Sequence, residues 1–199
     1  MDARLFDGIN QFAVATPWLH AALTGYASYG VLLFAALMLA GWWYARGTGD
    51  PRRMAAALLA PVATGLAIAV NQPLVALFHE PRPYTAHPGI LVLATRSTDF
   101  SFPSDHSVMA GAAAAALWFV SRRLGLVTTV AALLMGFSRV YIAAHYPHDV
   151  LAGLAVGAAV AIIVVPLARP LATRLVDVVG RTPMRPLVVA GPPLPAGRP

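Results

Sequence analysis

Three short clusters of polar residues interrupt an otherwise apolar chain. Each combines side chains that can bind an anion or move a proton. The clusters are Glu80-Pro81-Arg82-Pro83-Tyr84, Ser101-Phe102-Pro103-Ser104-Asp105-His106, and Ser138-Arg139 with His145 and Asp149. Ionisable groups next to long apolar segments are costly to keep and usually functional. The clusters therefore predict a site for chemistry.

The basic and hydroxyl groups of these clusters suit a phosphoryl group. Negative charge in the transition state of phosphoryl transfer lies on equatorial oxygens, and a planar guanidinium meets two of them with parallel hydrogen bonds. Arg82 and Arg139 supply two guanidinium groups, and Ser104 supplies a hydroxyl donor. Because Pro103-Ser104 opens a predicted helix, free backbone N–H groups there also suit an anion.

Two histidines can divide the work of a nucleophile and an acid. His145 and Asp149 are four residues apart, one turn if a helix continues through them. An aspartate can then bind one imidazole nitrogen and leave the other free to attack. His106 can protonate the departing oxygen, so a bell-shaped pH profile is expected. His145, His148 and Asp149 could instead bind a metal, but the nearby arginines would repel a cation, so no metal or other cofactor is predicted.

Composition places the site in a membrane protein. The chain has 199 residues, of which 58% are hydrophobic and 11% charged, about half the charge of a soluble domain. It has no cysteine, which excludes thiol nucleophiles and zinc–thiolate sites. All basic residues are arginine and the net charge is +6, but no basic stripe with interleaved aromatic residues predicts nucleic-acid binding.

Long apolar runs predict an all-α polytopic bundle of about five to six helices. The expected spans are Ala21–Tyr44, Met54–Phe78, Ser107–Val120, Leu124–Ala144 and Val150–Leu167. Residues 3–15 show helical spacing of apolar side chains, which favours a first helix lying at the membrane surface over one that extends the first span. We expect one membrane domain over residues 1–179 and a disordered Pro- and Arg-rich tail over residues 180–199.

Arginine distribution predicts the orientation. Most arginines fall in the loops after the first and third spans and in the C-terminal segment, and cytoplasmic loops carry excess positive charge. We therefore expect a multi-pass protein of the bacterial plasma membrane, with a cytoplasmic C-terminus. The polar clusters then face the outside.

The clusters resemble the signatures of the type 2 phosphatidic acid phosphatase family. Pro103-Ser104-Asp105-His106 is similar to that family's Pro-Ser-Gly-His motif, and Ser138-Arg139 through His145 to Asp149 matches its third motif at each defined position. The first motif, Lys followed after six residues by Arg-Pro, reads Val75 to Arg82-Pro83.

The resemblance implies a role for each matching residue. His145 would form a phosphohistidine without a metal, Asp149 would orient it, and His106 would be the general acid. Phosphoryl binding would fall to Arg82, Ser104 and Arg139. Secondary candidates, with less defined roles, are Ser138, Asp105, Tyr84, Glu80 and Arg96.

Two departures from the family motifs narrow the expected substrate. Val75 replaces the motif Lys and Asp105 replaces the motif Gly, and both features resemble the bacitracin-resistance subgroup of undecaprenyl-diphosphate phosphatases. Arg96 or His79 would then replace the missing cation, and Tyr84 or Arg96 would contact the second phosphate.

The resemblance therefore favours a polyprenyl diphosphate as the substrate. Alternatives are a phosphatase for phosphatidylglycerophosphate or phosphatidic acid, and a non-catalytic lipid or anion transporter. In each case the expected partners are a lipid phosphate and the surrounding membrane lipids. Oligomeric state is not predicted.

Overall fold

The computed structural model describes residues 2–190, and its regular secondary structure in that range is entirely helical. The α-helices are α1 (Asp2–Ala15), α2 (His20–Thr48), α3 (Pro51–Phe78), α4 (Pro83–Ala86), α5 (Asp105–Trp118), α6 (Arg122–Tyr141) and α7 (Pro147–Val179). Two short 3-10 helices are η1 (Pro17–Leu19) and η2 (Arg185–Leu187). The predicted all-α fold is confirmed.

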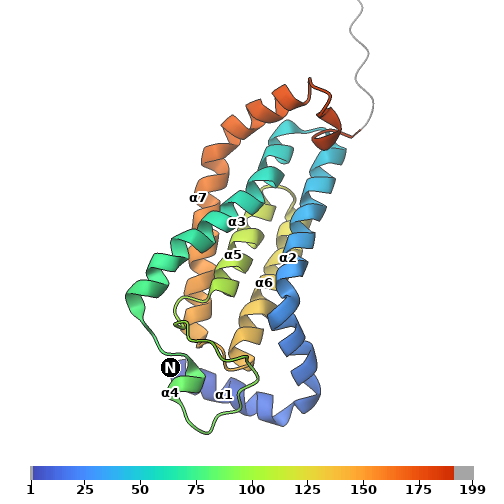
Figure 1. Ribbon diagram of the computed structural model, residues 1–199. Helices are drawn as coiled ribbons and strands as arrows, with labels where there is room; N and C mark the ends of the chain where they lie inside the picture. The colour runs from blue at the N-terminus through green and yellow to red at the C-terminus, as the bar shows by residue number, and fades with distance from the viewer. Residues whose placement is uncertain (1, 191–199) are drawn as a thin grey trace, which may run out of the picture.

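Five helices form a bundle, and most of them are long enough to cross a membrane. Four segments qualify by length and hydropathy: Pro17–Thr48, Pro51–Ala86, Arg122–Tyr141 and Pro147–Val179. The fifth helix, α5, has 14 residues and begins at Asp105. It packs against α2, α3, α6 and α7, and therefore forms the centre of the bundle rather than part of its outer surface (Figure 1).

Small residues let α5 and α7 approach closely. A Cβ atom added to Gly153 of α7 would lie 2.7 Å from the carbonyl oxygen of Ser104, and one added to Gly157 would collide with the carbonyl of Val108. These contacts fix the start of α5 against the first three turns of α7. The two helices that carry His106 and Asp149 are thus held at a set distance.

The amphipathic segment near the N-terminus is a helix, as its spacing predicts. Figure 1 shows α1 lying across one end of the bundle, close to α4. Phe6 and Ala13 are buried, and Asn10 uses its whole amide: Nδ2 donates to the carbonyl of Leu91 (2.8 Å), and Oδ1 accepts from Leu91 N–H (3.1 Å). The helix therefore anchors the loop between α4 and α5.

The other end of the bundle carries the C-terminal segment (Figure 1). Residues 180–190, which composition assigns to the tail, pack back on α2. Trp42 Nε1 donates to the carbonyl of Leu187 (3.0 Å), and Ala190 N–H donates to the carbonyl of Arg46 (2.9 Å). Residues 191–199 of the expected tail lie outside the described residues.

One helix boundary differs from the expectation in a way that matters for the site. The expected span Leu124–Ala144 ends three residues earlier, since α6 stops at Tyr141 and Ala143 takes a φ of 60°. Helix α7 begins at Pro147, whose ring disfavours helical geometry in the residue before it. His145 therefore lies in a loop, and the one-turn helical relation to Asp149 is wrong.

Candidate active site

The polar clusters meet at the end of the bundle that carries α1 and α4. They surround a cavity of about 500 Å³. The lining comes from the end of α3, the segment between α3 and α4, the loop between α4 and α5, the start of α5, the end of α6 and the α6–α7 loop. Its polar side chains are Gln72, His79, Arg82, Thr98, Asp99, Asp105, His106, Arg139 and His145.

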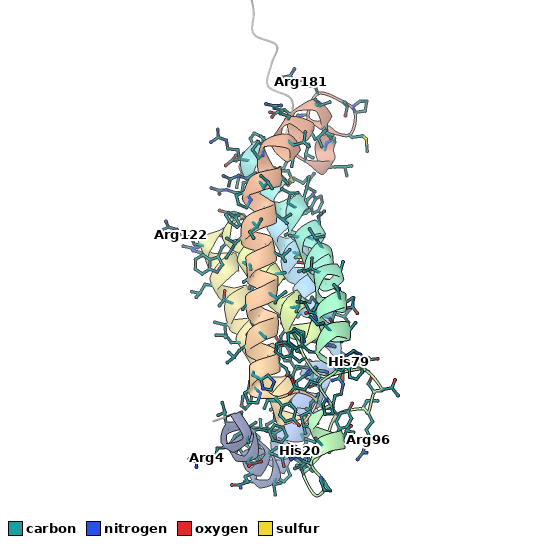
Figure 2. All side chains as sticks on the ribbon, turned by 90° about the vertical axis from the view of Figure 1, so that its left-hand side faces the viewer. Arg4, His20, His79, Arg96, Arg122 and Arg181 are labelled. Atoms are coloured by element: carbon teal, nitrogen blue, oxygen red, sulfur yellow. The ribbon has the colours of Figure 1, made fainter. Side chains whose placement is uncertain are left out.

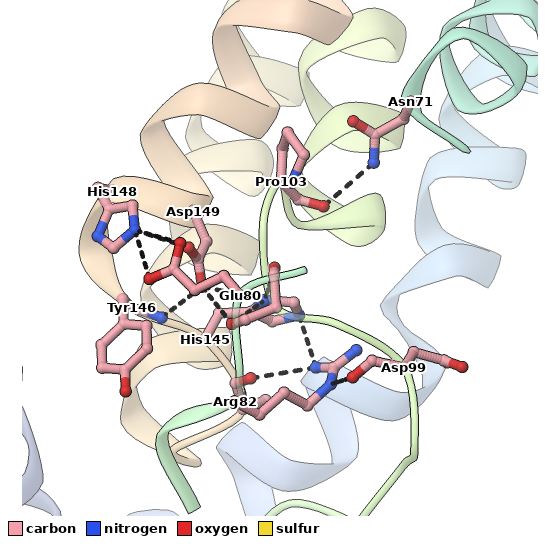
Figure 3. Close-up of polar contacts among 11 residues, drawn as sticks. Asn71, Glu80, Arg82, Asp99, Pro103, His145, Tyr146, His148 and Asp149 are labelled. Atoms are coloured by element: carbon pink, nitrogen blue, oxygen red, sulfur yellow. Dashed lines mark hydrogen bonds and ion pairs between the residues drawn. The ribbon is translucent and has the colours of Figure 1, made fainter. Parts of the chain in front are cut away.

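The hydrogen bonds of His145 define which ring nitrogen carries the proton (Figure 3). Nδ1 lies 2.8 Å from the backbone carbonyl of Ser101, which can only accept, so Nδ1 holds the proton. Nε2 lies 3.1 Å from Nη1 of Arg82, which can only donate, so Nε2 is a lone-pair acceptor. The lone pair of Nε2 therefore faces Arg82, which lines the cavity together with His145.

Asp149 supports this arrangement from the far side of the ring. Its Oδ2 lies 3.5 Å from His145 Nδ1, farther than the Ser101 carbonyl. The same oxygen accepts from Tyr146 N–H (2.8 Å) at the start of α7 and from the hydroxyl of Ser101. Asp149 thus orients His145 both through its charge and by fixing the loop.

Ser101 is the residue that the sequence interpretation missed. It is fully buried, its carbonyl accepts from His145, and its hydroxyl donates to Asp149. Its own N–H donates to the carbonyl of Glu80 (2.8 Å). The sequence offered one indication of this role, which is that Ser101 belongs to the second polar cluster. Its carbonyl contact with His145 could not be predicted, because every residue type has a backbone carbonyl.

The two arginines approach the cavity from different elements. Arg82 precedes α4, and its Nε donates to the carbonyl of Asp99 (3.0 Å) and its Nη1 to that of Ala144 (3.1 Å). Arg139 lies in the last turn of α6. Its Nη1 is 3.4 Å from the carbonyl of Ala27, while its buried Nε has no hydrogen-bond partner among the described residues. Donor capacity therefore remains for an anion.

His106 and Ser104 occupy the start of α5. His106 lines the cavity. Ser104 N–H donates to the carbonyl of Asp149 (3.2 Å), which ties α5 to α7. The Ser104 hydroxyl is buried and has no hydrogen-bond partner within residues 2–190, but Ser104 is not among the residues that line the cavity.

Asp105 is held by amide side chains from α3. Asn71 Nδ2 donates to Oδ1 at 2.7 Å, and Gln72 Nε2 donates to the same oxygen at 3.1 Å. Asp105 and Val75 both line the cavity. The two positions that depart from the family motifs therefore face the same space, on the α3 side.

Tyr84, Arg96 and Ser138 do not belong to the lining that the described residues form. The Tyr84 hydroxyl bonds to the backbone of Ser97, and the Arg96 guanidinium lies 5.7 Å from the Tyr84 ring centroid. Ser138 Oγ donates to the carbonyl of Met135 in its own helix (2.7 Å). His79 is the remaining cation candidate that lines the cavity.

Glu80 pairs with His148 beside the site. His148 Nε2 lies 3.0 Å from Glu80 and 3.1 Å from Oδ1 of Asp149 (Figure 3). Ligand atoms of these three residues lie within 4.8 Å of one another, so they could hold a cation. His145, expected in the alternative metal site, instead turns its Nδ1 to Ser101.

Burial keeps the imidazole of His145 uncharged. Burial is the largest of the causes that together lower the pKa of His145 from 6.5 to about 4; the interaction with Asp149 opposes the shift, and the charges of Arg139 and Arg82 add to it. The ring is therefore neutral at pH 7, with a lone pair on Nε2 beside two guanidinium groups. Such a site can accept a tetrahedral anion and attack its central atom.

Comparisons with known proteins identify related membrane phosphatases. Residues 55–171 match the PAP2 superfamily. Undecaprenyl-diphosphatase BcrC of Bacillus subtilis is 32% identical over 157 residues, which cover 78% of each chain.

Two solved structures share the fold, each with a TM-score of 0.62. One is the PAP2 type phosphatidylglycerolphosphate phosphatase of Bacillus subtilis, at 23% identity over 84% of this chain and 86% of that one. The other is Aquifex aeolicus LpxE, at 25% identity over 81% of this chain and 93% of that one. This chain therefore belongs to the PAP2 superfamily and is a multi-pass membrane phosphatase.

Proposed function

We propose that the protein hydrolyses a polyprenyl diphosphate to the monophosphate and inorganic phosphate. The observation that carries the proposal is the lone pair of His145 Nε2, held against Arg82 beside a cavity lined by a second arginine and His106. The similarity to an undecaprenyl-diphosphatase over most of both chains supports the substrate class. The variant positions Val75 and Asp105 support it as well, because both line the cavity.

The proposed reaction has two steps. Nε2 of His145 attacks the terminal phosphorus, a P–N bond forms, and the bond to the bridging oxygen breaks. Burial and the charges of Arg139, His145 and Arg82 lower the pKa of His106 to about 4, so His106 takes up a proton together with the anionic substrate. It donates that proton to the bridging oxygen, and the lipid monophosphate leaves. Water then attacks the phosphorus of the phosphohistidine and gives its proton to His106, and the P–N bond breaks to release phosphate. The guanidinium groups of Arg82 and Arg139 stabilise the equatorial oxygens in both steps.

A phosphatase for a lipid phosphomonoester is the second candidate. It is favoured by the position of Tyr84 and Arg96, which pack on each other instead of lining the cavity to meet a second phosphate. A panel of polyprenyl diphosphate, phosphatidylglycerophosphate and phosphatidic acid, with released phosphate measured in detergent, separates the two. Much faster turnover of phosphatidylglycerophosphate would reject the diphosphate.

His145→Ala is the control in that panel. The proposed mechanism predicts loss of hydrolysis for all three lipids with the fold retained, and a phosphate label on His145 in the wild-type protein after rapid quenching. Full activity of His145→Ala would reject the covalent mechanism, whichever lipid is preferred.

His106→Gln adds a test of the leaving group. When a phosphomonoester is cleaved, the leaving group is an alkoxide, which needs a proton. When a diphosphate is cleaved, the leaving group is a phosphate monoester whose second pKa is about 6, so it needs a proton less. The variant should lose roughly 100-fold or more on the monoester and clearly less on the diphosphate. Equal losses would contradict the role of His106 as general acid.

We further propose that the protein lies in the bacterial plasma membrane with the active site outside and the C-terminus in the cytoplasm. The support is the arginine distribution. Arg52, Arg122 and Arg181 lie toward the end of the bundle that carries the α2–α3 turn, the α5–α6 turn and the C-terminal segment. Figure 2 labels Arg122 and Arg181. The cavity lies at the other end. Excess arginine marks the cytoplasmic side.

A further inference from the structure

A second polar cavity lies at the end of the bundle opposite the active site. Its volume is about 480 Å³. Four arginines from three helices line it: Arg52 and Arg53 from the start of α3, Arg122 from the start of α6, and Arg169 from α7. None of them belongs to the phosphatase site.

The cavity has an excess of positive charge. Among the described residues that line it, Asp50 is the one carboxylate. Asp50 already caps α3, where its Oδ1 accepts from the N–H groups of Arg52 (2.9 Å) and Arg53 (3.4 Å). Its Oδ2 lies 3.8 Å from Arg53 Nε. Four guanidinium groups against one carboxylate leave a net charge of +3 facing the cavity.

Helix lengths place the cavity at the depth of lipid headgroups. Helix α6 has 20 residues, about 30 Å, which matches the hydrocarbon thickness of a bilayer. Arg139 at its last turn belongs to the active site, so Arg122 at its first turn reaches the opposite boundary. Figure 2 shows Arg122 projecting from the side of the molecule, below the end that carries Arg181.

An apolar groove adjoins the arginine cavity. It has a volume of about 380 Å³ and lies between α5, α6 and α7. Its lining includes Ala115, Leu133, Ala158 and Ile162. Trp118 and Phe119 line both the groove and the cavity. The arginine cavity and the apolar groove therefore share one aromatic corner, and the groove extends from it along α5, α6 and α7.

We propose that this composite surface binds an anionic phospholipid of the leaflet opposite the active site. The phosphate of the headgroup lies among Arg52, Arg122 and Arg169, and one acyl chain lies in the groove beside Trp118. Basic pockets between membrane helices are suited to anionic headgroups, and a planar guanidinium is suited to phosphate oxygens. A soluble anion would use the cavity but would leave the adjoining groove without an occupant.

The bound lipid would contact several helices that also carry active-site residues. It contacts α3, α5, α6 and α7, whose other ends position the catalytic side chains. Binding therefore stabilises the bundle as a whole, and the expected readout is thermal stability of the full-length protein rather than turnover alone.

The test compares two charge-matched triple variants in detergent. Arg52→Gln/Arg122→Gln/Arg169→Gln removes three arginines that line the cavity. Arg123→Gln/Arg174→Gln/Arg181→Gln removes the same charge from arginines outside it. Added phosphatidylglycerol at tenfold excess over its Kd should raise the melting temperature of the wild type and the control by about 5 °C, and phosphatidylcholine should not. The cavity variant should lose that shift.

Two further arms identify the part of the lipid that is bound. Ala158→Phe fills the groove and leaves the arginines in place, so it should weaken the shift with phosphatidylglycerol. Inorganic phosphate and glycerol phosphate should stabilise the wild type much less than the lipid. If both triple variants lost the shift in melting temperature equally, the effect would come from net charge and not from this cavity. If free phosphate stabilised the wild type as much as phosphatidylglycerol does, the cavity would be a site for a soluble anion. Either result overturns the proposal.

Discussion

At the scale of single residues, the site depends on His145 being held by groups with fixed roles. The Ser101 carbonyl can only accept and the Arg82 guanidinium can only donate. The polar clusters and the family motifs predicted one shared site. Of the six principal residues, Arg82, His106, Arg139 and His145 line one cavity, whereas Ser104 and Asp149 are not part of its lining. The sequence could not show the contribution of Ser101, because a carbonyl group is common to every residue.

Removing the hydroxyl of Ser101 should weaken catalysis while binding persists. Ser101→Ala keeps the carbonyl that accepts from His145 but removes the donor to Asp149. We expect kcat to fall about tenfold, the value of roughly one charge-assisted hydrogen bond, with KM little changed. Ser138→Ala is the matched control, since Ser138 Oγ bonds within its own helix. Equal effects on kcat in both variants would contradict a positioning role.

The buried, neutral His145 should make stability depend on pH. Its pKa falls from 6.5 to about 4 on folding, so between these values the unfolded chain binds a proton that the folded chain does not. The free energy of unfolding should therefore decrease as pH falls from 6.5 to 4. Melting temperatures in detergent across this range measure it. His145→Gln should show a shallower dependence, and an unchanged slope would refute the assignment.

At the scale of elements, hydropathy predicted the long helices well and their ends poorly. The third apolar run, expected over Ser107–Val120, is the short central helix Asp105–Trp118. Its neighbours α3 and α7 cover it, so it needs no full span of its own. The loop after α6 was missed because Ile142 and Ala143 are as apolar as the helix they end, and only the effect of Pro147 on the residue before it marks the break.

The close approach of α5 and α7 should be sensitive to a single methyl group. Gly153→Ala would place a Cβ 2.7 Å from the Ser104 carbonyl and 2.9 Å from Ser107 Cβ. Overpacking of this kind costs about 1–3 kcal/mol, and displacement of Ser104 should also lower activity. Gly65→Ala on α3 is the control, because its Cβ would meet nothing within 4 Å. A Gly153→Ala protein with wild-type melting temperature and activity would rule out this constraint.

At the scale of the whole molecule, the two ends of the bundle differ in kind. The end that carries α1 and α4 also holds the phosphatase cavity. The opposite end carries most of the arginines of the described residues and the C-terminal segment (Figure 1). Composition predicted a membrane protein, and the long apolar runs predicted that it is polytopic. Which helices lie side by side could not be predicted, because lipid-facing and buried apolar residues have the same hydropathy.

Because the chain has no cysteine, its orientation can be tested with single introduced thiols. Gly89→Cys lies in the loop at the active-site end and Arg181→Cys lies at the other end. With the active site outside, a membrane-impermeant maleimide added to intact cells should label the first variant and not the second. Permeabilised cells should show labelling of both. The reverse pattern in intact cells would invert the proposed topology.

The proton on Nδ1 of His145 also sets the regiochemistry of any covalent intermediate. With Nδ1 turned to the Ser101 carbonyl and Nε2 directed toward Arg82, only one of the two positional isomers of the phosphoramidate can form, the one linked through Nε2. That isomer leaves the Nδ1–H contact intact, so the ring need not rotate between formation and hydrolysis of the adduct. Phosphorus NMR of the trapped adduct distinguishes the isomers without reference to the lipid that supplied the phosphate.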